Sequence, residues 1–363
     1  MLVEAPVLEA VGRPQVMRRV EVLDPGPGEV RVRMAASGVC HSCLHIADGS
    51  HHGLPFPLIL GDEGAGVVES VGPGVDDLAP GDHVILSWSD HCGRCRWCAA
   101  GRPRLCTRSV PAGTMADGTT RFRLDGAPVY HMGPSSYAPL VVVSEVMAIR
   151  IRPEMPLEAA ALIGCAVTTG VGAVTNTARL RPGESLAVFG CGGVGINAIQ
   201  GGRMVGASPV IAVDLLDGRL DLARRVGATE TVRADLPDVP GAIREITGPG
   251  VDCAVVATGS IAAMEIALAS LAPGGALVLV GVPPFGERMA VDPLALVPAE
   301  RRILGSSYGS AVPAVEFPRL VDAYFAGTLL LDELITARYA PDQAEAAFAP
   351  LRAGEGLRSL IVF

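Results

Sequence analysis

The sequence contains no lysine: its 29 basic residues are all arginine. Without a lysine amine the chain cannot form a Schiff base with a carbonyl substrate, which excludes that class of covalent catalysis. The arginines are scattered along the chain and the formal net charge is -9, so the clustered basic surface typical of nucleic-acid binding is also missing. We therefore expect no nucleic-acid partner.

Long hydrophobic runs are missing as well, although 49% of the residues are hydrophobic. The longest apolar runs, such as 140–143 and 276–282, have the length of a strand and fall far short of the roughly 20 residues that span a bilayer. Residues 1–10 include two acidic residues and no basic segment followed by an apolar core, so they do not resemble a signal peptide. These absences predict a cytoplasmic protein with no membrane partner.

The length of 363 residues is too great for one ordinary domain and fits two. In the first half, Val30, Val32 and Met34 alternate with arginines, and residues 64–75 show a strand pattern interrupted by glycine turns. Short strands joined by glycine and proline predict a compact, barrel-like β domain.

From about Gly183 the pattern changes to short apolar strands that alternate with helices, which is typical of a doubly wound parallel sheet. After about Ser306 the periodicity becomes irregular, and the chain ends in a strand pattern that could return to the first domain. The expected segments are strand 186–189, helix 194–205, strand 210–213, helix 219–226, strand 252–257, helix 261–271, strand 276–281 and strand 357–363.

The nine cysteines are an odd number, and four of them lie close together in the sequence, which suits metal ligation in a reducing compartment better than a set of disulfides. Cys92, Cys95, Cys98 and Cys106 follow the spacing C-x2-C-x2-C-x7-C. Four thiolates at this spacing can surround one zinc ion tetrahedrally within a single loop and leave no open position for chemistry. We therefore predict a structural zinc site.

A glycine-rich turn follows the strand at 186–189. Gly190, Gly192 and Gly195 occupy the glycine positions of G-x-G-x-x-G, and a helix is expected to begin there. These glycines permit a tight turn, close approach of a pyrophosphate and close packing of the helix, whose N-terminus faces the phosphates. Asp214, 19 residues beyond Gly195, can bind the ribose hydroxyls and would repel a 2′-phosphate, which favours NAD over NADP. The alternative is a glycine turn of another α/β protein, with Asp214 capping the next helix.

Together with Gly81–Val84 and the run 113–119, the cysteine cluster and the glycine turn resemble the zinc-dependent medium-chain alcohol dehydrogenases, from about residue 20 to the C-terminus. The resemblance is greatest to the class III, formaldehyde dehydrogenase-like branch and to bacterial nicotinoprotein alcohol dehydrogenases, the latter through residues 195–201. It implies an α/β protein that combines a GroES-like β-rich catalytic domain with a Rossmann doubly wound parallel sheet that binds NAD(H). The expected boundaries are 1–166 and 307–363 for the catalytic domain and 167–306 for the Rossmann domain. A homodimer joined at a sheet edge near 276–282 is also implied.

The resemblance further implies a catalytic zinc held by a cysteine, a histidine and a second cysteine. Cys40 and Cys165 match the two cysteines, but Asp62 stands where the histidine is expected, with the family's glutamate retained as Glu63. Cys43 stands where the family has an aspartate that supports the histidine. The carboxylate and the third strong ligand have thus exchanged places in the sequence.

Three interpretations of this exchange remain open. Asp62 ligates zinc directly, or Cys43 completes a three-thiolate site with Asp62 behind it, or the site has no metal. In the first two cases the ligands leave a formal charge of about -1, where the family's site is neutral. A further anion disfavours loss of a proton from an alcohol, typically by roughly one to three pKa units. In the third case the chain would reduce an activated C=N or C=C bond, or a carbonyl, without a Lewis acid.

The other family positions are present. The resemblance assigns Ser42 and His45 to the proton relay, and it assigns several residues to the cofactor: His41, Gly193, Val194, Arg219 and Arg358. His51, Trp88 and Tyr137 correspond to the substrate pocket. The simpler alternatives are a polar loop residue for His45, solvated surface charges for His41 and Arg358, and core packing for Trp88 and Tyr137.

The resulting hypothesis is an NAD(H)-dependent oxidoreductase that transfers hydride between the nicotinamide and an alcohol or aldehyde at an atypical zinc site. The alternatives are the zinc-free reductase and a non-redox protein that retains NAD. The second is disfavoured because an idle site need not keep the glycine turn, Asp214, Ser42 and His45 together.

Overall fold

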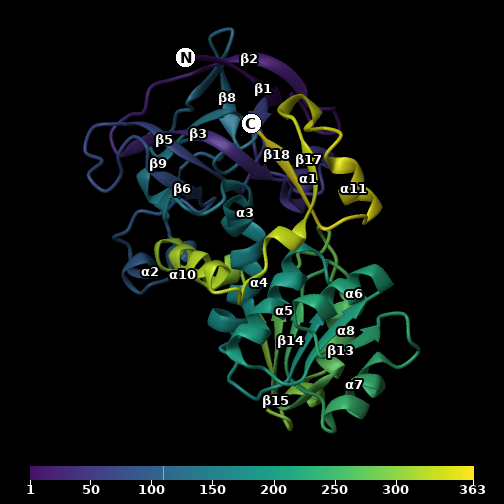
Figure 1. Ribbon diagram of the computed structural model, residues 1–363. Helices are drawn as coiled ribbons and strands as arrows, with labels where there is room; N and C mark the ends of the chain where they lie inside the picture. Colours follow the sequence, from purple (N-terminus) through teal and green to yellow (C-terminus); the bar gives the residue numbers. More distant parts are fainter. Residues whose placement is uncertain (109) are drawn as a thin grey trace. The chain divides into compact units, whose positions relative to one another are not determined.

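The computed structural model describes residues 1–108 and 110–363. The chain divides into two compact units, which Figure 1 shows in the colours of the sequence. Unit 1 comprises Met1–Cys165, Val312–Phe325 and Leu331–Phe363. Unit 2 comprises Ala166–Ala311 and Ala326–Leu330.

Unit 1 is built on two β sheets. A five-stranded sheet has the order β1-β2-β7-β8-β4, and a seven-stranded sheet has the order β10-β6-β5-β3-β18-β17, with β9 also paired to β3. The bounds are β1 Leu2–Val7, β2 Val16–Val22, β3 Glu29–Gly38, β4 Leu58–Ile59, β5 Gly64–Val71, β6 His83–Leu86, β7 Phe122–Leu124, β8 Ala127–His131, β9 Leu140–Ser144, β10 Ala148–Arg150, β17 Ile335–Tyr339 and β18 Arg358–Val362.

The expected alternation in β3 is confirmed, because Val30, Val32 and Met34 are buried while Arg33 between them is exposed. Their side chains belong to the apolar core of unit 1. The C-terminal strand does return to this unit: β18 pairs antiparallel with β3, with Leu360 opposite Gly38.

Short helices complete unit 1: α1 His41–Asp48, α2 Arg96–Ala99, α3 Leu157–Leu162, α10 Pro313–Phe325 and α11 Phe348–Ala353. The sequence interpretation missed α10, where it found only irregular periodicity after Ser306. This helix buries Pro313, Phe317, Leu320 and Val321, which is a helical spacing, but Pro318 lies inside it and obscures the pattern.

Unit 2 contains a six-stranded parallel sheet of order β13-β12-β11-β14-β15-β16, which confirms the doubly wound α/β architecture. Its helices lie about this sheet in Figure 1. The bounds are β11 Leu186–Phe189, α5 Gly193–Val205, β12 Val210–Asp214, α6 Asp217–Val226, β13 Glu230–Arg233, α7 Val239–Thr247, β14 Val251–Val256, α8 Ile261–Ala269, β15 Leu271–Leu279, α9 Pro293–Leu296 and β16 Arg302–Gly305.

Two expectations for unit 2 were wrong. The helix expected to run to Leu271 ends at Ala269, because β15 begins at Leu271. The segment near 276–282 is not a sheet edge: β15 lies between β14 and β16, so β16 forms the edge. The strand β16 has only two apolar residues, Ile303 and Leu304, so it shows no strand pattern in the sequence, unlike the four-residue apolar strand β11.

The run Leu157–Ala178 is the one described helical segment long and apolar enough to cross a membrane by length and composition, with a mean hydropathy of 1.7. It alternates between α-helical and π-helical turns: α3, η3 (Ile163–Val167), α4 (Thr168–Gly172) and η4 (Ala173–Ala178). Its apolar window is 89% buried, as in the core helix of a globular protein. Counting uninterrupted apolar residues missed this run because glycine and threonine divide it.

Candidate metal and cofactor sites

The four cysteines of the predicted structural zinc site lie together in unit 1. The sulfur atoms of Cys92, Cys95, Cys98 and Cys106 all lie within 4.8 Å of one another. Individual Sγ–Sγ distances are 3.5 Å from Cys95 to Cys98 and 3.6 Å from Cys106 to Cys92. These separations suit a tetrahedral ion, whose Zn–S bonds are about 2.3 Å long.

Backbone N–H groups point at these sulfurs and stabilise negative charge on them. The Cys106 sulfur accepts from the amides of Cys92 and Arg108, each at 3.4 Å. Backbone amides at Cys98 and Thr107 lower the pKa of Cys95 to about 5. Burial and the neighbouring sulfurs raise the pKa of Cys98 to about 12, so the cluster favours a cation that holds all four sulfurs as thiolates.

A second cluster of possible metal ligands is buried in unit 1. One oxygen of the Asp62 carboxylate and the sulfurs of Cys40 and Cys165 lie within 4.8 Å of one another. The Cys40 and Cys165 sulfurs are 3.9 Å apart, and the Cys165 sulfur is 3.6 Å from Asp62 Oδ2. Three segments distant in sequence therefore converge on one point.

The local backbone brings these side chains together. Cys40 is the N-cap of α1, while Cys165 lies on the π-helical turn η3. Gly61 has φ +115°, and a Cβ there would meet the backbone nitrogen of Tyr137 at 2.7 Å, so only glycine fits before Asp62. A Cβ on Gly164 would meet the carbonyl oxygen of Leu86 at 2.7 Å, so this glycine permits the close approach that places Cys165.

The charges of this cluster repel one another in the absence of a cation. Burial, together with the neighbouring Cys40 charge, raises the pKa of Asp62 to about 8. A hydrogen bond from the Cys165 thiol holds the pKa of Cys40 well below its usual value, and the same bond raises the pKa of Cys165. A divalent cation would favour the ionised form of all three groups, so the donor set fits zinc.

Glu63 and Arg358 form a buried ion pair beside the cluster. Both side chains are almost fully excluded from solvent. Arg358 is therefore not a solvated surface charge, and its positive charge helps to lower the pKa of Cys40. The sequence identified both residues singly but could not show that they pair across 295 positions.

Both expected relay residues, Ser42 and His45, lie on α1. The Ser42 hydroxyl is 3.5 Å from the Cys40 sulfur, and it also stabilises the charge on Asp62. His45 is half-buried, with its ring centroid 4.9 Å from that of His51 and 6.0 Å from that of His41, which is exposed. Ser42 thus touches the metal cluster, and His45 lies one helical turn further on.

Two of the expected pocket residues, Trp88 and Tyr137, differ from each other in how deeply they are buried. Trp88 is half-buried, and Gly133 separates it from Asp62: a Cβ on this glycine would meet Trp88 Cβ at 3.1 Å and Asp62 Cα at 3.7 Å. Tyr137 is completely buried, with its ring 6.5 Å from that of Phe348. Its burial favours the core-packing role.

The glycine turn of unit 2 has the form that a dinucleotide requires. Gly190 has φ +88°, and a Cβ on Gly195 would collide with the carbonyl oxygen of Gly190. A Cβ on Gly192 would meet only the guanidinium of Arg219, at 3.8 Å, so the space in front of the turn is open. Gly193 and Val194, both half-buried, begin the 13-residue helix α5. The open turn and the helix N-terminus fit a pyrophosphate.

Asp214 ends β12 and is anchored by the same turn. Its Oδ2 accepts from the backbone nitrogen of Cys191 at 2.7 Å, and its Oδ1 accepts from that of Leu216 at 3.0 Å. Arg219 lies 4.0 Å from Oδ2. These two backbone bonds fix the direction of the carboxylate.

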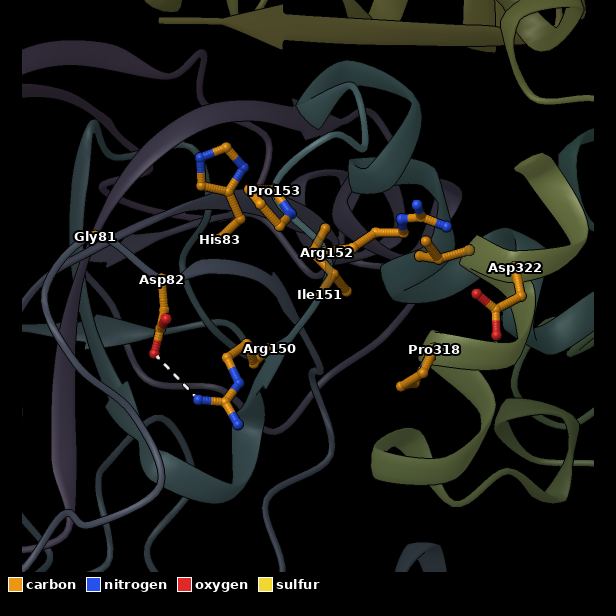
Figure 2. Close-up of a pocket in the computed structure, with 10 residues that line it drawn as sticks. Gly81, Asp82, His83, Arg150, Ile151, Arg152, Pro153, Pro318 and Asp322 are labelled. Atoms are coloured by element: carbon orange, nitrogen blue, oxygen red, sulfur yellow. Dashed lines mark ion pairs between the residues drawn. The ribbon is translucent and has the colours of Figure 1, made fainter.

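A surface pocket of about 490 Å³ lies elsewhere in unit 1, between the start of β6, the end of β10 and α10. Figure 2 shows Arg150 directed at Asp82, with a nitrogen–oxygen distance of 3.7 Å. Apolar side chains of Pro153 and Pro318 line it together with charges of both signs. None of the predicted site residues lines this pocket, so it adds nothing to the metal and cofactor sites.

Fold and sites together define a zinc-binding dehydrogenase, and comparison with known proteins agrees. The family described as "Zinc-binding dehydrogenase" matches residues 193–325, and "Alcohol dehydrogenase GroES-like domain" matches residues 26–153. S-(hydroxymethyl)glutathione dehydrogenase of Escherichia coli O139:H28 (strain E24377A / ETEC) is 37% identical over 364 residues, covering 98% of each chain.

Solved structures show the same relationship. An alcohol dehydrogenase zinc-binding domain protein from Burkholderia ambifaria superposes with a TM-score of 0.96 at 37% identity, covering 100% of this chain and 99% of the other. Benzyl alcohol dehydrogenase from Acinetobacter calcoaceticus gives 0.95 at 32% identity, with the same coverage. The chain therefore belongs to the zinc-binding medium-chain alcohol dehydrogenase family and is an oxidoreductase with a GroES-like domain and a Rossmann sheet.

Proposed function

We propose that this enzyme transfers hydride reversibly between NAD(H) and a primary alcohol or its aldehyde, at a zinc site formed by Cys40, Asp62 and Cys165. The observation that carries the proposal is the convergence of these three buried donors within 4.8 Å. Two of the three named relatives act, by their printed names, on compounds with a hydroxymethyl or benzylic alcohol group. A zinc ion at this position would polarise the oxygen of the reacting group.

The residues around the cluster have distinct parts in this reaction. Ser42, next to the Cys40 sulfur, is placed to accept the alcohol proton, and His45 one turn further on is placed to pass it to solvent. The nicotinamide would supply or receive the hydride. Glu63 and Arg358 stabilise the region beside the cluster through their buried ion pair.

NAD(H) is the proposed cofactor because of the glycine turn and Asp214. The carboxylate of Asp214 is fixed by the amides of Cys191 and Leu216 and would repel the 2′-phosphate of NADP. Replacement of Asp214 by glycine should relax the discrimination against NADPH. Tighter binding of NADPH than of NADH by the unaltered enzyme would contradict the assignment.

The decisive experiment measures metal content and cofactor oxidation together. Purified enzyme should contain two zinc ions per chain and should oxidise NADH when aldehydes are added. A single zinc per chain, with NADH oxidised only by iminium or activated alkene substrates, would favour the zinc-free reductase. Bound NAD that never turns over with any of these substrates would favour the non-redox binding protein.

A homodimer is also proposed, joined at the edge strand β16. Before this strand in the chain, the segment 282–297 exposes Phe285 (96% exposed), Leu294 (77%) and Val297 (75%). Apolar side chains exposed to this degree, close in sequence to an edge strand, suit a second copy of the chain. Light scattering on the Leu294→Asp variant should show monomers where the unaltered enzyme shows dimers, and equal masses would contradict the interface.

A further inference from the structure

Helix α1 aims two cysteines at the same carboxylate. Cys40 caps the helix, and Cys43 follows three residues later on its buried face with Leu44, Ile46 and Ala47. Residues three apart on a helix lie on one side of it. Both sulfurs therefore face the loop that carries Asp62.

The two oxygens of the Asp62 carboxylate face different sulfurs. The Cys43 sulfur is 3.6 Å from Oδ1, with the thiol as donor, while the Cys165 sulfur is 3.6 Å from Oδ2. Cys43 stays outside the group of three donor atoms that lie within 4.8 Å of one another, namely those of Cys40, Asp62 and Cys165. Ligands of one tetrahedral zinc with thiolates are separated by only about 3.8 Å, so the observed arrangement favours Cys40, Asp62 and Cys165 as the ligands and leaves Cys43 outside them.

The surroundings of Cys43 are mainly apolar. Its side chain is fully buried in the apolar core of unit 1, which also contains Tyr137. A thiol in this position supplies a weak hydrogen-bond donor to the carboxylate.

We propose that Cys43 is a positioning residue and not a zinc ligand: its S–H donates to Asp62 Oδ1 and thereby presents Oδ2 to the metal beside Cys40 and Cys165. The role rests on the proposed zinc site. In the family a carboxylate at position 43 supports the ligand at position 62. Here the carboxylate at position 62 is itself the ligand, and the cysteine at position 43 orients it. Outer partners of this kind typically change metal affinity about 10- to 100-fold when they are removed.

Two substitutions at position 43 test the role. Cys43→Ala removes the donor and should weaken binding of the catalytic zinc about 10- to 100-fold in competition with a chelator. Cys43→Ser keeps a donor and should restore affinity to within a few-fold of the unaltered enzyme. Cys253→Ala, at a buried cysteine of unit 2 outside both metal clusters, is the matched control and should change nothing.

When cobalt replaces zinc at the catalytic site, the intensity of the thiolate-to-cobalt charge-transfer band reports the number of thiolate ligands. If Cys43 is not a ligand, the thiolate-to-cobalt charge-transfer band keeps its intensity in both variants at saturating metal. Loss of roughly one third of that band, one thiolate of three, would overturn the proposal, as would unchanged zinc affinity in Cys43→Ala. Failure of the unaltered enzyme to take up cobalt here would contradict the zinc site itself and Cys43's role with it.

Discussion

The two cysteine clusters of unit 1 differ in how the chain builds them. The four-cysteine cluster comes from one loop, Cys92 to Cys106, and its residues are half-exposed. The second cluster joins Cys40, Asp62 and Cys165 from three segments and is buried. Spacing alone identifies the first cluster, whereas only the folded chain brings the second together.

The clusters also differ in what they contribute to stability. Four thiolates complete the coordination of a structural ion, and the energy of binding is then folding energy. Three buried donors leave a coordination position open for substrate, and without metal their charges oppose one another. The comparison therefore predicts that one cluster stabilises the fold while the other serves the reaction at some cost in stability.

The largest expected effect is at the stabilising cluster. Cys95→Ser should release one zinc per chain and lower the melting temperature by roughly 10 °C, because a structural site adds its binding energy to folding. Metal analysis and calorimetry measure both. Cys253→Ser, outside the clusters, should leave the zinc content unchanged. A Cys95→Ser protein with full zinc content would contradict the assignment of the four-cysteine cluster as a structural zinc site.

Loss of a ligand from the cluster of Cys40, Asp62 and Cys165 should reduce activity strongly and stability only slightly. Cys40→Ser should release the other zinc and reduce kcat/KM for aldehyde reduction at least about 1000-fold, since the Lewis acid is lost. The melting temperature should stay within a few degrees of the unaltered enzyme. A fall in melting temperature as large as that of Cys95→Ser would contradict the proposal that only the four-cysteine cluster stabilises the fold.

The metal-free protein can test how much the buried Asp62 carboxylate lowers the free energy of unfolding. Because the pKa of Asp62 is raised to about 8 in the folded state and is near 3.9 in unfolded chains, the folded state holds the extra proton between these values. Stability of metal-free protein should therefore fall as pH rises from about 4 to 8. Asp62→Asn should remove this dependence and stabilise the metal-free protein by roughly 5 kcal/mol at pH 7.5.

Denaturant unfolding with a chelator present, at pH 5 and pH 7.5, measures the difference between the two proteins. The difference in the free energy of unfolding should be small at the lower pH and several-fold larger at the higher one. With zinc added, the order should reverse, because only the unaltered protein gains binding energy. Equal stability of both metal-free proteins at pH 7.5 would show that Asp62 carries no penalty.

The limits of sequence-based prediction follow from the same contrast. The glycine turn, β11, α5 and the four-cysteine loop were predictable because each depends on neighbours in the sequence. The distinction between Asp62 and Cys43 was not, because it depends on which carboxylate oxygen faces which sulfur. Helix α10 was missed because of Pro318, and the edge strand β16 was missed because only two of its four residues are apolar.

The smallest expected effect comes from restoring the family's arrangement with the double change Asp62→His and Cys43→Asp. The imidazole makes the site formally neutral, and the new carboxylate supports it in place of the Cys43 thiol. Since an extra anion disfavours loss of the alcohol proton, the double variant should oxidise simple alcohols about tenfold faster at pH 7, a gain of about 1.4 kcal/mol. The unaltered enzyme should improve more steeply as pH rises.

The single variant Asp62→His is the control for this change. Cys43 would leave the new imidazole without a carboxylate partner, so the single variant should gain less than the double one. Both must be compared at equal zinc content, measured on the same samples. A double variant that binds two zinc ions and oxidises alcohols no faster would show that the charge at position 62 does not set the reaction preference. Side chains beside the site would then become the better explanation, first among them Trp88, which Gly133 separates from Asp62.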